Sequence, residues 1–394
     1  MGKRGTGRKR RFKTAVMSSS PSRRVRFRFF SALMGIVLTG LLLLLIEVVF
    51  RLFAGPASDP ELWIPFEQTE ASRSAIEFHR ERLQLHRPDR LLFWSVRPNL
   101  NISFRGVQVR TNSMGLRDDE VPGKKAGDEL RILVLGESTA FGDLVEQDET
   151  FSEVLEGGLS ERLPECEVSV INAGVTGYSL FQSVRYLEER GRKLNPDAVL
   201  IYHGYNDFLP TTFAAERSGA SVEDAGLTDR ELAEARAKFP ANLDQLLSHN
   251  STAYRWLRML GASNDAVVLE YRTSSRSRVP EPDRWALLEQ IRELVETMGA
   301  RFVVLVPAYR DFGDHRKTLL EFGNVTETPT IDFERAIQSM DGQRDSLFFA
   351  DGLHPRPPLH HKMAEYAVTG LLESAREGRF SKLSRCLGEA GSQE

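Results

Sequence analysis

Polar side chains that could carry out chemistry occur directly after apolar runs of this sequence. Ser138 follows the run 131–136, and Asp351 and His354 lie three positions apart in "DGLHP". A serine hydroxyl becomes a nucleophile when an imidazole removes its proton, and a nearby carboxylate can fix the imidazole tautomer. Each stretch also has an ordinary interpretation, since Gly-x-Ser often begins a helix and Asp-Gly is common in surface turns. Together, the three residues favour attack of Ser138 on a carbonyl carbon.

Two further stretches, "NAGVTG" and "GYND", supply groups that could stabilise negative charge on the carbonyl oxygen. The donors would be the backbone N–H groups of Ser138 and Gly177 and the side-chain amide of Asn206. Gly174 is the alternative to Gly177, because either glycine lets the backbone approach a substrate closely. Gly174 and His203 are also candidates for substrate contact, although glycines are common in turns and a strand-end histidine often only packs.

An alternation of expected strands and helices positions these four stretches. Short apolar runs predict strands, and amphipathic spacing predicts the helices between them. The expected strands are 131–136, 167–174, 197–204, 301–309 and 346–355, and the expected helices are 150–163, 179–194, 281–300 and 359–377. Repeated βα units predict a parallel sheet with helices on both faces, which is a three-layer α/β/α sandwich. In such sheets ligands bind beyond the carboxyl ends of the strands, where all four stretches fall.

The four stretches, in this order, resemble blocks I, II, III and V of the SGNH (GDSL-type) hydrolase superfamily. The resemblance covers about residues 131–375 and places the family's nucleophile at Ser138, its oxyanion donors at Ser138, Gly177 and Asn206, and its Asp/His pair at Asp351 and His354. It implies a flavodoxin-like fold, ester hydrolysis through an acyl-enzyme, and no cofactor. The family's Gly-Asp-Ser is Gly-Glu-Ser here, and we expect Glu137 only to orient the turn. "TNSMGLRD" is similar to a segment found ahead of this domain in membrane-anchored bacterial members.

Other enzyme classes fit the sequence less well. The α/β-hydrolase elbow needs Gly-x-Ser-x-Gly, but Ala140 stands at the position of the second glycine. The sequence has no P-loop and no dinucleotide-binding glycine pattern. His360 and His361 lie on the last expected helix without the pattern of a metal site, so we interpret them as helix surface and expect no bound metal.

The N-terminal part has the composition of a membrane anchor. Residues 1–28 hold eleven Lys and Arg and no acidic residue, whereas the rest of the chain has 55 acidic and 41 basic residues. Phe29 to Ile46 is an uncharged run of 18 residues, about 27 Å of helix, which matches a bilayer core. We predict an uncleaved anchor at 29–50 with the tail in the cytoplasm, a cleaved signal peptide being the alternative. The acidic remainder argues against a nucleic-acid partner.

The expected organisation has five parts. They are a basic cytoplasmic tail (1–28), a transmembrane signal anchor (29–50), a stalk with a small β-containing lead-in (51–129), the hydrolase domain (130–375) and a polar C-terminal tail (376–394). Within the lead-in, 78–90 predicts a helix and 101–110 a strand pair. The polar stretch 209–280 predicts a helical insertion that could cover the site as a lid. Cys166 and Cys386, the only cysteines, could pair in an oxidising compartment, which the sequence leaves open.

Three functions are compatible with these patterns. We expect first a membrane-anchored serine esterase with its catalytic domain in the periplasm or outside the cell, removing acyl groups, preferentially acetyl, from a glycan or lipid. An O-acyltransferase that modifies an exported polysaccharide would use the same Ser138, His354 and Asp351. A non-catalytic glycan-binding scaffold would predict loss of the nucleophile or the base, and both are present. The preference for a glycan rests on analogy with the family alone.

Overall fold

The computed structural model describes residues 23–53, 84–211, 226–238, 247, 251, 253–254, 276–310, 315–340 and 344–387. The tail up to residue 22, most of the stalk, most of the insertion at 209–280 and the last seven residues lie outside the described residues. The chain divides into two compact units, Met1–Asp59 and Pro60–Glu394. The first contains helix α1 (Arg23–Phe53), whose apolar window Phe30–Val49 has the length and composition of a membrane span or a signal sequence.

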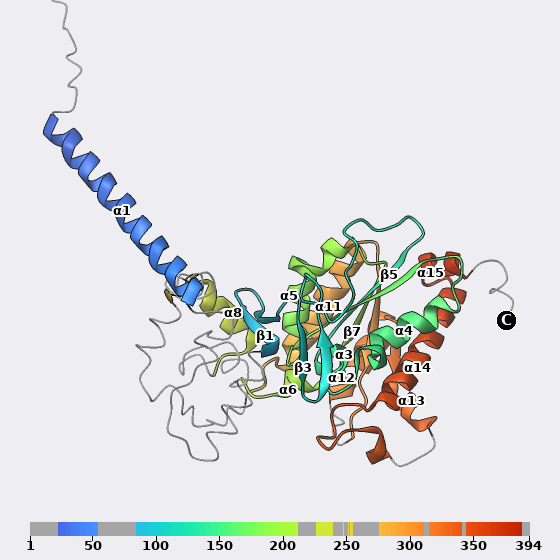
Figure 1. The fold of residues 1–394 in the computed structure, drawn as a ribbon. Helices are drawn as coiled ribbons and strands as arrows, with labels where there is room; N and C mark the ends of the chain where they lie inside the picture. The colour runs from blue at the N-terminus through green and yellow to red at the C-terminus, as the bar shows by residue number, and fades with distance from the viewer. Residues whose placement is uncertain are drawn as a thin grey trace, which may run out of the picture. The chain divides into compact units, whose positions relative to one another are not determined.

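A five-stranded parallel sheet forms the centre of the second unit (Figure 1). Its strands, in spatial order, are β6 (Val168–Gly174), β5 (Leu130–Gly136), β7 (Ala198–Tyr202), β8 (Arg301–Val306) and β9 (Thr330–Asp332). Strands β5 and β7 are buried along their whole length, as expected for parallel strands covered on both faces. The strand order reverses direction at β5, so the switch point of the sheet lies beside the carboxyl end of this strand.

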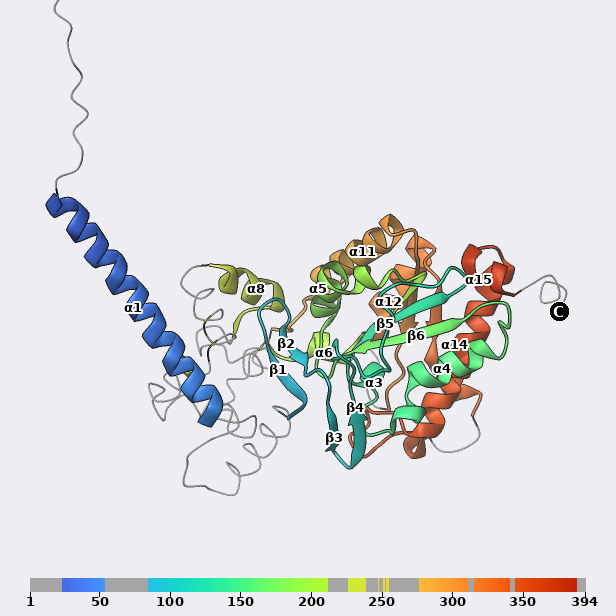
Figure 2. The same ribbon diagram turned by 45° about the horizontal axis from the view of Figure 1, so that its top comes forward.

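Helices cover both faces of the sheet (Figure 2). Alternate residues of β5 belong to two separate cores. Leu133 and Leu135 belong to one core, and Ile132 and Val134 belong to the other, because successive strand side chains point to opposite faces. Helices α5 (Leu180–Glu189), α11 (Glu281–Thr297) and α12 (His315–Thr326) contribute to the first core. Helices α4 (Phe151–Ser160), α13 (Phe333–Gln338), α14 (Pro357–Arg376) and α15 (Ser381–Cys386) contribute to the second. The predicted three-layer α/β/α sandwich with a flavodoxin-like sheet is therefore confirmed.

Two antiparallel strand pairs precede the sheet. They are β1 (His86–Asp89) with β2 (Phe93–Val96), and β3 (Asn101–Phe104) with β4 (Val107–Arg110). The second pair is the one predicted at 101–110. The first occupies residues for which we predicted a helix, and that prediction is wrong for 86–89. Phe93 and Trp94 of β2 are buried in the same core as α5, so tertiary burial outweighs the helical spacing of this stretch.

The last strand of the sheet lies elsewhere than predicted. Residues 346–355 form no strand; they contain the end of the 3₁₀ helix η7 (Arg344–Leu347) and one isolated bridge between Phe348 and Pro355. The apolar character of this stretch comes from Leu347 and Phe348, which are buried in the core of α14. Strand β9 instead completes the sheet beside β8, and its three residues are too few to show a period in the sequence.

A disulfide links the two cysteines whose pairing the sequence left open. Cys166 and Cys386 are bonded, with their Cα atoms 5.4 Å apart and 220 positions between them in the chain. The bond connects the turn before β6 to the end of α15, so it closes most of the second unit into one covalent loop.

Candidate active site

The candidate nucleophile lies where the central strand meets a short helix. Strand β5 ends at Gly136, and Ser138 is the first residue of α3 (Ser138–Phe141). Ser138 is partly exposed, whereas its neighbours Glu137 and Thr139 are buried. The first backbone N–H groups of a helix have no partner within the helix. The hydroxyl and the backbone N–H of Ser138 are thus presented together at the carboxyl edge of the sheet.

The candidate base and its carboxylate are locked together in one turn. Nδ1 of His354 donates to Oδ2 of Asp351 at 2.6 Å, and Oδ1 of Asp351 accepts the backbone N–H groups of Leu353 and His354 at 2.9 and 3.0 Å. Burial raises the pKa of Asp351, but these hydrogen bonds outweigh burial and hold it below its ordinary value. Within the described part of the chain, Nε2 of His354 has no hydrogen-bond partner. Nε2 is therefore the nitrogen available to accept a proton.

A second carboxylate, which the sequence did not indicate, lies beside that nitrogen. Oδ2 of Asp143 is 3.9 Å from Nε2 of His354. The buried Asp143 side chain accepts the Thr176 hydroxyl at 2.7 Å and pairs with Arg105 at 3.3 Å. Burial lowers the pKa of His354, but the hydrogen bond to Asp351 and the charge of Asp143 raise it by more. The pKa of His354 therefore lies above its ordinary value. The base thus lies between two carboxylates.

The segment "TNSMGLRD" holds the loop that carries Asp143. Its Arg117 side chain is buried, and the guanidinium donates to the backbone carbonyls of Gly142 and of Val145, the second at 2.7 Å. Burial lowers the pKa of Arg117 to about 10, which leaves it charged at neutral pH. This segment therefore fixes the chain that follows the candidate nucleophile.

The candidate oxyanion donors lie on the two neighbouring strand ends. Gly177 is the third residue of a turn closed by a hydrogen bond from Tyr178 N–H to Val175 O at 3.0 Å, and its φ of 83° suits a type II turn. Among the described residues, Gly177 N–H makes no backbone hydrogen bond. Asn206, in α6 (Tyr205–Phe208), donates one side-chain N–H to Tyr178 O at 3.1 Å. Its amide has a second N–H, and no hydrogen bond from it to the described residues is present, so it is a candidate donor to a substrate.

Glu137 connects the ends of three strands rather than facing the reaction. One carboxylate oxygen accepts the backbone N–H of Asn206 at 3.1 Å, and the other accepts the hydroxyl of Tyr309, which follows β8. Burial raises the pKa of Glu137 to about 7. The carboxylate therefore fixes the position of Asn206 relative to Ser138, in agreement with the expectation that Glu137 orients the turn.

Two candidates for substrate contact are instead occupied by internal packing. The Nε2 atom of His203 lies 2.7 Å from the Ser183 hydroxyl, the side chain is 1% exposed, and burial lowers its pKa to about 3. A Cβ on Gly174 would lie 2.4 Å from the backbone nitrogen of Phe141, so this glycine permits close contact between β6 and α3. The expectation that either residue contacts substrate is not supported, and Gly177 is the better oxyanion candidate.

His360 also differs from the sequence expectation. The sequence predicts helix surface, but His360 lies on the buried face of α14 and is fully buried, and burial lowers its pKa to about 3. His361, one residue later, is exposed as expected. His360 lies among the apolar residues of the buried face of α14, which include Leu359 and Met363. It is therefore a neutral core side chain.

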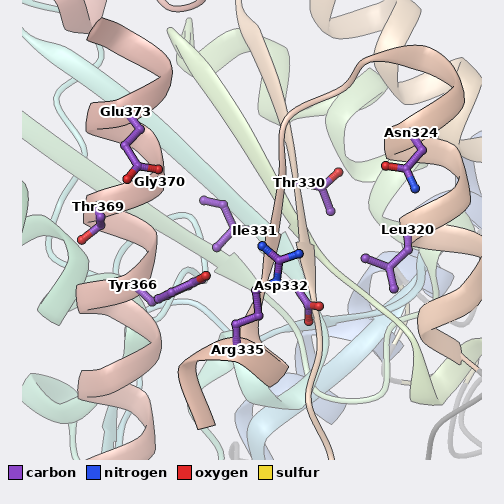
Figure 3. Close-up of a pocket in the computed structure, with 10 residues that line it drawn as sticks. All are labelled: Leu320, Asn324, Thr330, Ile331, Asp332, Arg335, Tyr366, Thr369, Gly370 and Glu373. Carbon is purple, nitrogen blue, oxygen red and sulfur yellow. The ribbon is translucent and has the colours of Figure 1, made fainter. Parts of the chain in front are cut away.

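A cavity of about 280 Å³ lies away from these residues, at the β9 edge of the sheet (Figure 3). Side chains of Tyr366 and Glu373 line it from α14, and Arg335 and Asp332 line it near the start of α13. Strands β7 and β8 separate this edge from β5, so the cavity is not part of the candidate active site.

The doubly wound sheet and the candidate residues fit an acyl hydrolase: Ser138, Gly177 and Asn206 follow neighbouring strands, and His354 is hydrogen-bonded to Asp351. The model of the GDSL-like lipase/acylhydrolase family matches residues 134–362, more than half of the chain. The chain belongs to this family and is an ester hydrolase.

Solved structures similar to this chain include three with low sequence identity. A lipolytic protein of the G-D-S-L family from Desulfitobacterium hafniense DCB-2 has 13% identity and a TM-score of 0.37, covering 61% of this chain and 99% of that one. The esterase EstA from Pseudoalteromonas sp. has 14% identity and a TM-score of 0.38, covering 62% of this chain and 97% of that one. The acetylxylan esterase Axe2 from Geobacillus stearothermophilus has 14% identity and a TM-score of 0.38, covering 62% of this chain and 94% of that one. No curated protein matches the chain.

Proposed function

We propose that the protein is a membrane-anchored serine esterase that acts outside the cytoplasmic membrane through an acyl-enzyme. Ser138 attacks the ester carbonyl while Nε2 of His354 takes its proton, and the N–H groups of Ser138, Gly177 and Asn206 bind the oxyanion. His354 then returns the proton to the departing alcohol, and water releases the acid by the same steps. The observation that carries this proposal is the locked Asp351–His354 pair, whose Nε2 has no hydrogen-bond partner among the described residues.

Two observations support a location outside the cytoplasm. The apolar window of α1 is long enough to cross a bilayer, and the basic residues before it favour a cytoplasmic N-terminus. The disulfide between Cys166 and Cys386 is typical of an oxidising compartment. A reporter enzyme fused after Glu394 tests this: a reporter that needs export should be active, and one that works only in the cytoplasm should be inactive.

The proposed substrate is a short acyl ester, preferentially an acetyl ester, on a glycan or lipid. The same acyl-enzyme could pass its acyl group to a sugar hydroxyl, so hydrolysis and transfer differ only in the acceptor. Incubating the enzyme with an acetyl donor and oligosaccharides separates them. Free acetic acid as the product supports the esterase, and acetylated sugar would show the transferase.

Substitution of the nucleophile tests the mechanism in the full-length chain, purified in detergent. Ser138→Ala should lower kcat/KM for an aryl acetate by about 10³-fold or more without changing the fold. Ser160→Ala changes an exposed serine of α4 and should retain full activity, which controls for the substitution itself. A fluorophosphonate should label Ser138 in the unaltered protein. Undiminished turnover by Ser138→Ala, or labelling of another serine, would refute the assignment.

A further inference from the structure

The peptide unit between Thr176 and Gly177 is bound by a residue of the lead-in, which precedes the residues 134–362 matched by the family model. Trp94, in β2, donates its indole Nε1–H to the carbonyl oxygen of Thr176 at 3.2 Å. The indole is 2% exposed, so water does not compete for this hydrogen bond. The same peptide unit carries the N–H of Gly177, which is a proposed oxyanion donor. Trp94 therefore contacts the reverse side of a group that would face the substrate.

This hydrogen bond decides which way the donor points. A trans peptide directs its C=O and its N–H to opposite sides, so fixing Thr176 O on the indole directs Gly177 N–H away from it. The central peptide of a turn can rotate by about half a revolution between the type I and type II forms. Glycine accepts both forms without strain, and the φ of 83° shows that the type II form is present. A contact outside the turn can favour that form, and the indole is one that holds the peptide itself, through its carbonyl oxygen.

Trp94 also supports the second donor. The hydroxyl of Tyr178 donates to Trp94 O at 2.7 Å, and the two rings meet edge to face with centroids 5.8 Å apart. Tyr178 in turn accepts the side-chain N–H of Asn206 on its backbone oxygen at 3.1 Å. Trp94 thus contacts the turn that carries Gly177 and, within the same turn, the residue whose backbone oxygen accepts from Asn206.

A buried ion pair holds the following peptide in the same way. The guanidinium of Arg278 donates to Gly177 O at 2.8 Å and lies over the Trp94 ring at 5.6 Å. Its charge is balanced by Asp229 of α8 (Asp229–Ala237) at 2.9 Å, and both side chains are fully buried. The turn is therefore held by Trp94 of the lead-in and by Arg278 of the insertion, which also contact each other.

We propose that Trp94 is a positioning residue for the oxyanion hole, and that its indole N–H keeps the Thr176–Gly177 peptide in the orientation that stabilises the transition state. This inference rests on the proposed function. It means that the lead-in is part of the catalytic machinery of this chain and not only a connection to the anchor.

Replacing the indole N–H tests the inference in the full-length chain. Trp94→Phe should lower kcat for an aryl acetate by about 10- to 100-fold, which is less than complete loss of an oxyanion donor, while KM changes by less than about twofold. Affinity for an alkyl boronic acid, whose adduct with Ser138 is tetrahedral, should fall by a similar factor. Trp285→Phe, in α11 where the ring packs on Phe322, is the matched control and should leave both constants unchanged.

A correctly folded Trp94→Phe enzyme with unchanged kcat and boronic-acid affinity would overturn the inference. If this variant does not fold, single-site incorporation of β-(3-benzothienyl)alanine at position 94 keeps the bicyclic shape and replaces only the N–H by sulfur. The same loss of kcat is then expected, and unchanged kcat refutes the role. Ser138→Ala separates failure of the proposed function from failure of the role of Trp94. If Ser138→Ala remains active, the proposed function is wrong. If Ser138→Ala is inactive and Trp94→Phe is fully active, only the role of Trp94 is wrong.

Discussion

The carboxylate beside the candidate base offers a test with a defined sign. Oδ2 of Asp143 lies 3.9 Å from Nε2 of His354, and the carboxylate is buried. In the unaltered protein the Thr176 hydroxyl donates to Oδ1 of Asp143 at 2.7 Å. Asp143→Asn removes the negative charge but keeps an oxygen that can accept this hydrogen bond. The substitution therefore changes the electrostatics of the base with little change in shape.

The size of the effect follows from the distance and from one opposing charge. Two unit charges at this separation interact by about 1 kcal/mol in water and about 4 kcal/mol at the dielectric typical near a protein surface. Arg105, 3.3 Å from the same carboxylate and 22% exposed, offsets part of this. A net interaction of about 1 kcal/mol corresponds to a change in proton affinity of roughly threefold to tenfold.

The direction is fixed by which form of the imidazole is active. In the proposed mechanism the neutral imidazole is the base, and the charge of Asp143 favours the protonated form, so Asp143→Asn should lower the pKa of His354. The acid limb of kcat/KM then moves to lower pH. Activity on that limb, relative to the plateau, should rise about threefold to tenfold. The plateau itself should fall, because the imidazolium formed during acylation loses a stabilising charge.

A second variant, Arg105→Gln, tests the same electrostatic effect with the opposite sign. Arg105→Gln removes the positive charge that lowers the pKa of His354, so its acid limb should move to higher pH. Rates of aryl acetate hydrolysis are measured across the pH range, with the product quantified after every sample is brought to one alkaline pH. Limbs that do not move, or that move in the same direction in both variants, would refute the electrostatic role of Asp143.

Two further predictions concern stability. Replacing both Cys166 and Cys386 by serine opens a loop of 220 positions, which corresponds to about 5 kcal/mol of chain entropy, so Tm measured by circular dichroism should fall by about 10 °C or more. An unchanged Tm would show that the disulfide does not stabilise the fold. Gly174→Ala places a Cβ 2.4 Å from Phe141 N and should cost about 1–3 kcal/mol in denaturant unfolding as well as lower kcat by displacing α3. Gly157→Ala, whose Cβ would meet nothing within 4 Å, should stabilise α4 by about 0.5–1 kcal/mol, and equal effects of the two glycine substitutions would contradict the steric argument.

The sequence by itself was sufficient for the parts of this protein that depend on local pattern. Alternating apolar runs and amphipathic segments identified the layers of the sheet, because each element must bury its own apolar face. The Asp351–His354 pair could be read directly, since a three-residue turn brings the two side chains together whatever surrounds it. The apolar run at 29–46 likewise identified the helix α1 from composition alone.

Tertiary structure decided what depends on residues distant in the chain. Strand β9 was missed because three residues carry no periodicity, and the burial of His360 follows from how α14 packs and not from its neighbours in sequence. Trp94 lies 82 positions from Thr176, and nothing in the spacing of the two indicates a contact. The proximity of Asp143 to His354 likewise arises only when the fold brings together the loop after α3 and the turn before α14. Local spacing thus specified which groups could react, whereas the folded chain decided how they are oriented and charged, because orientation and electrostatics depend on contacts that only three-dimensional packing creates.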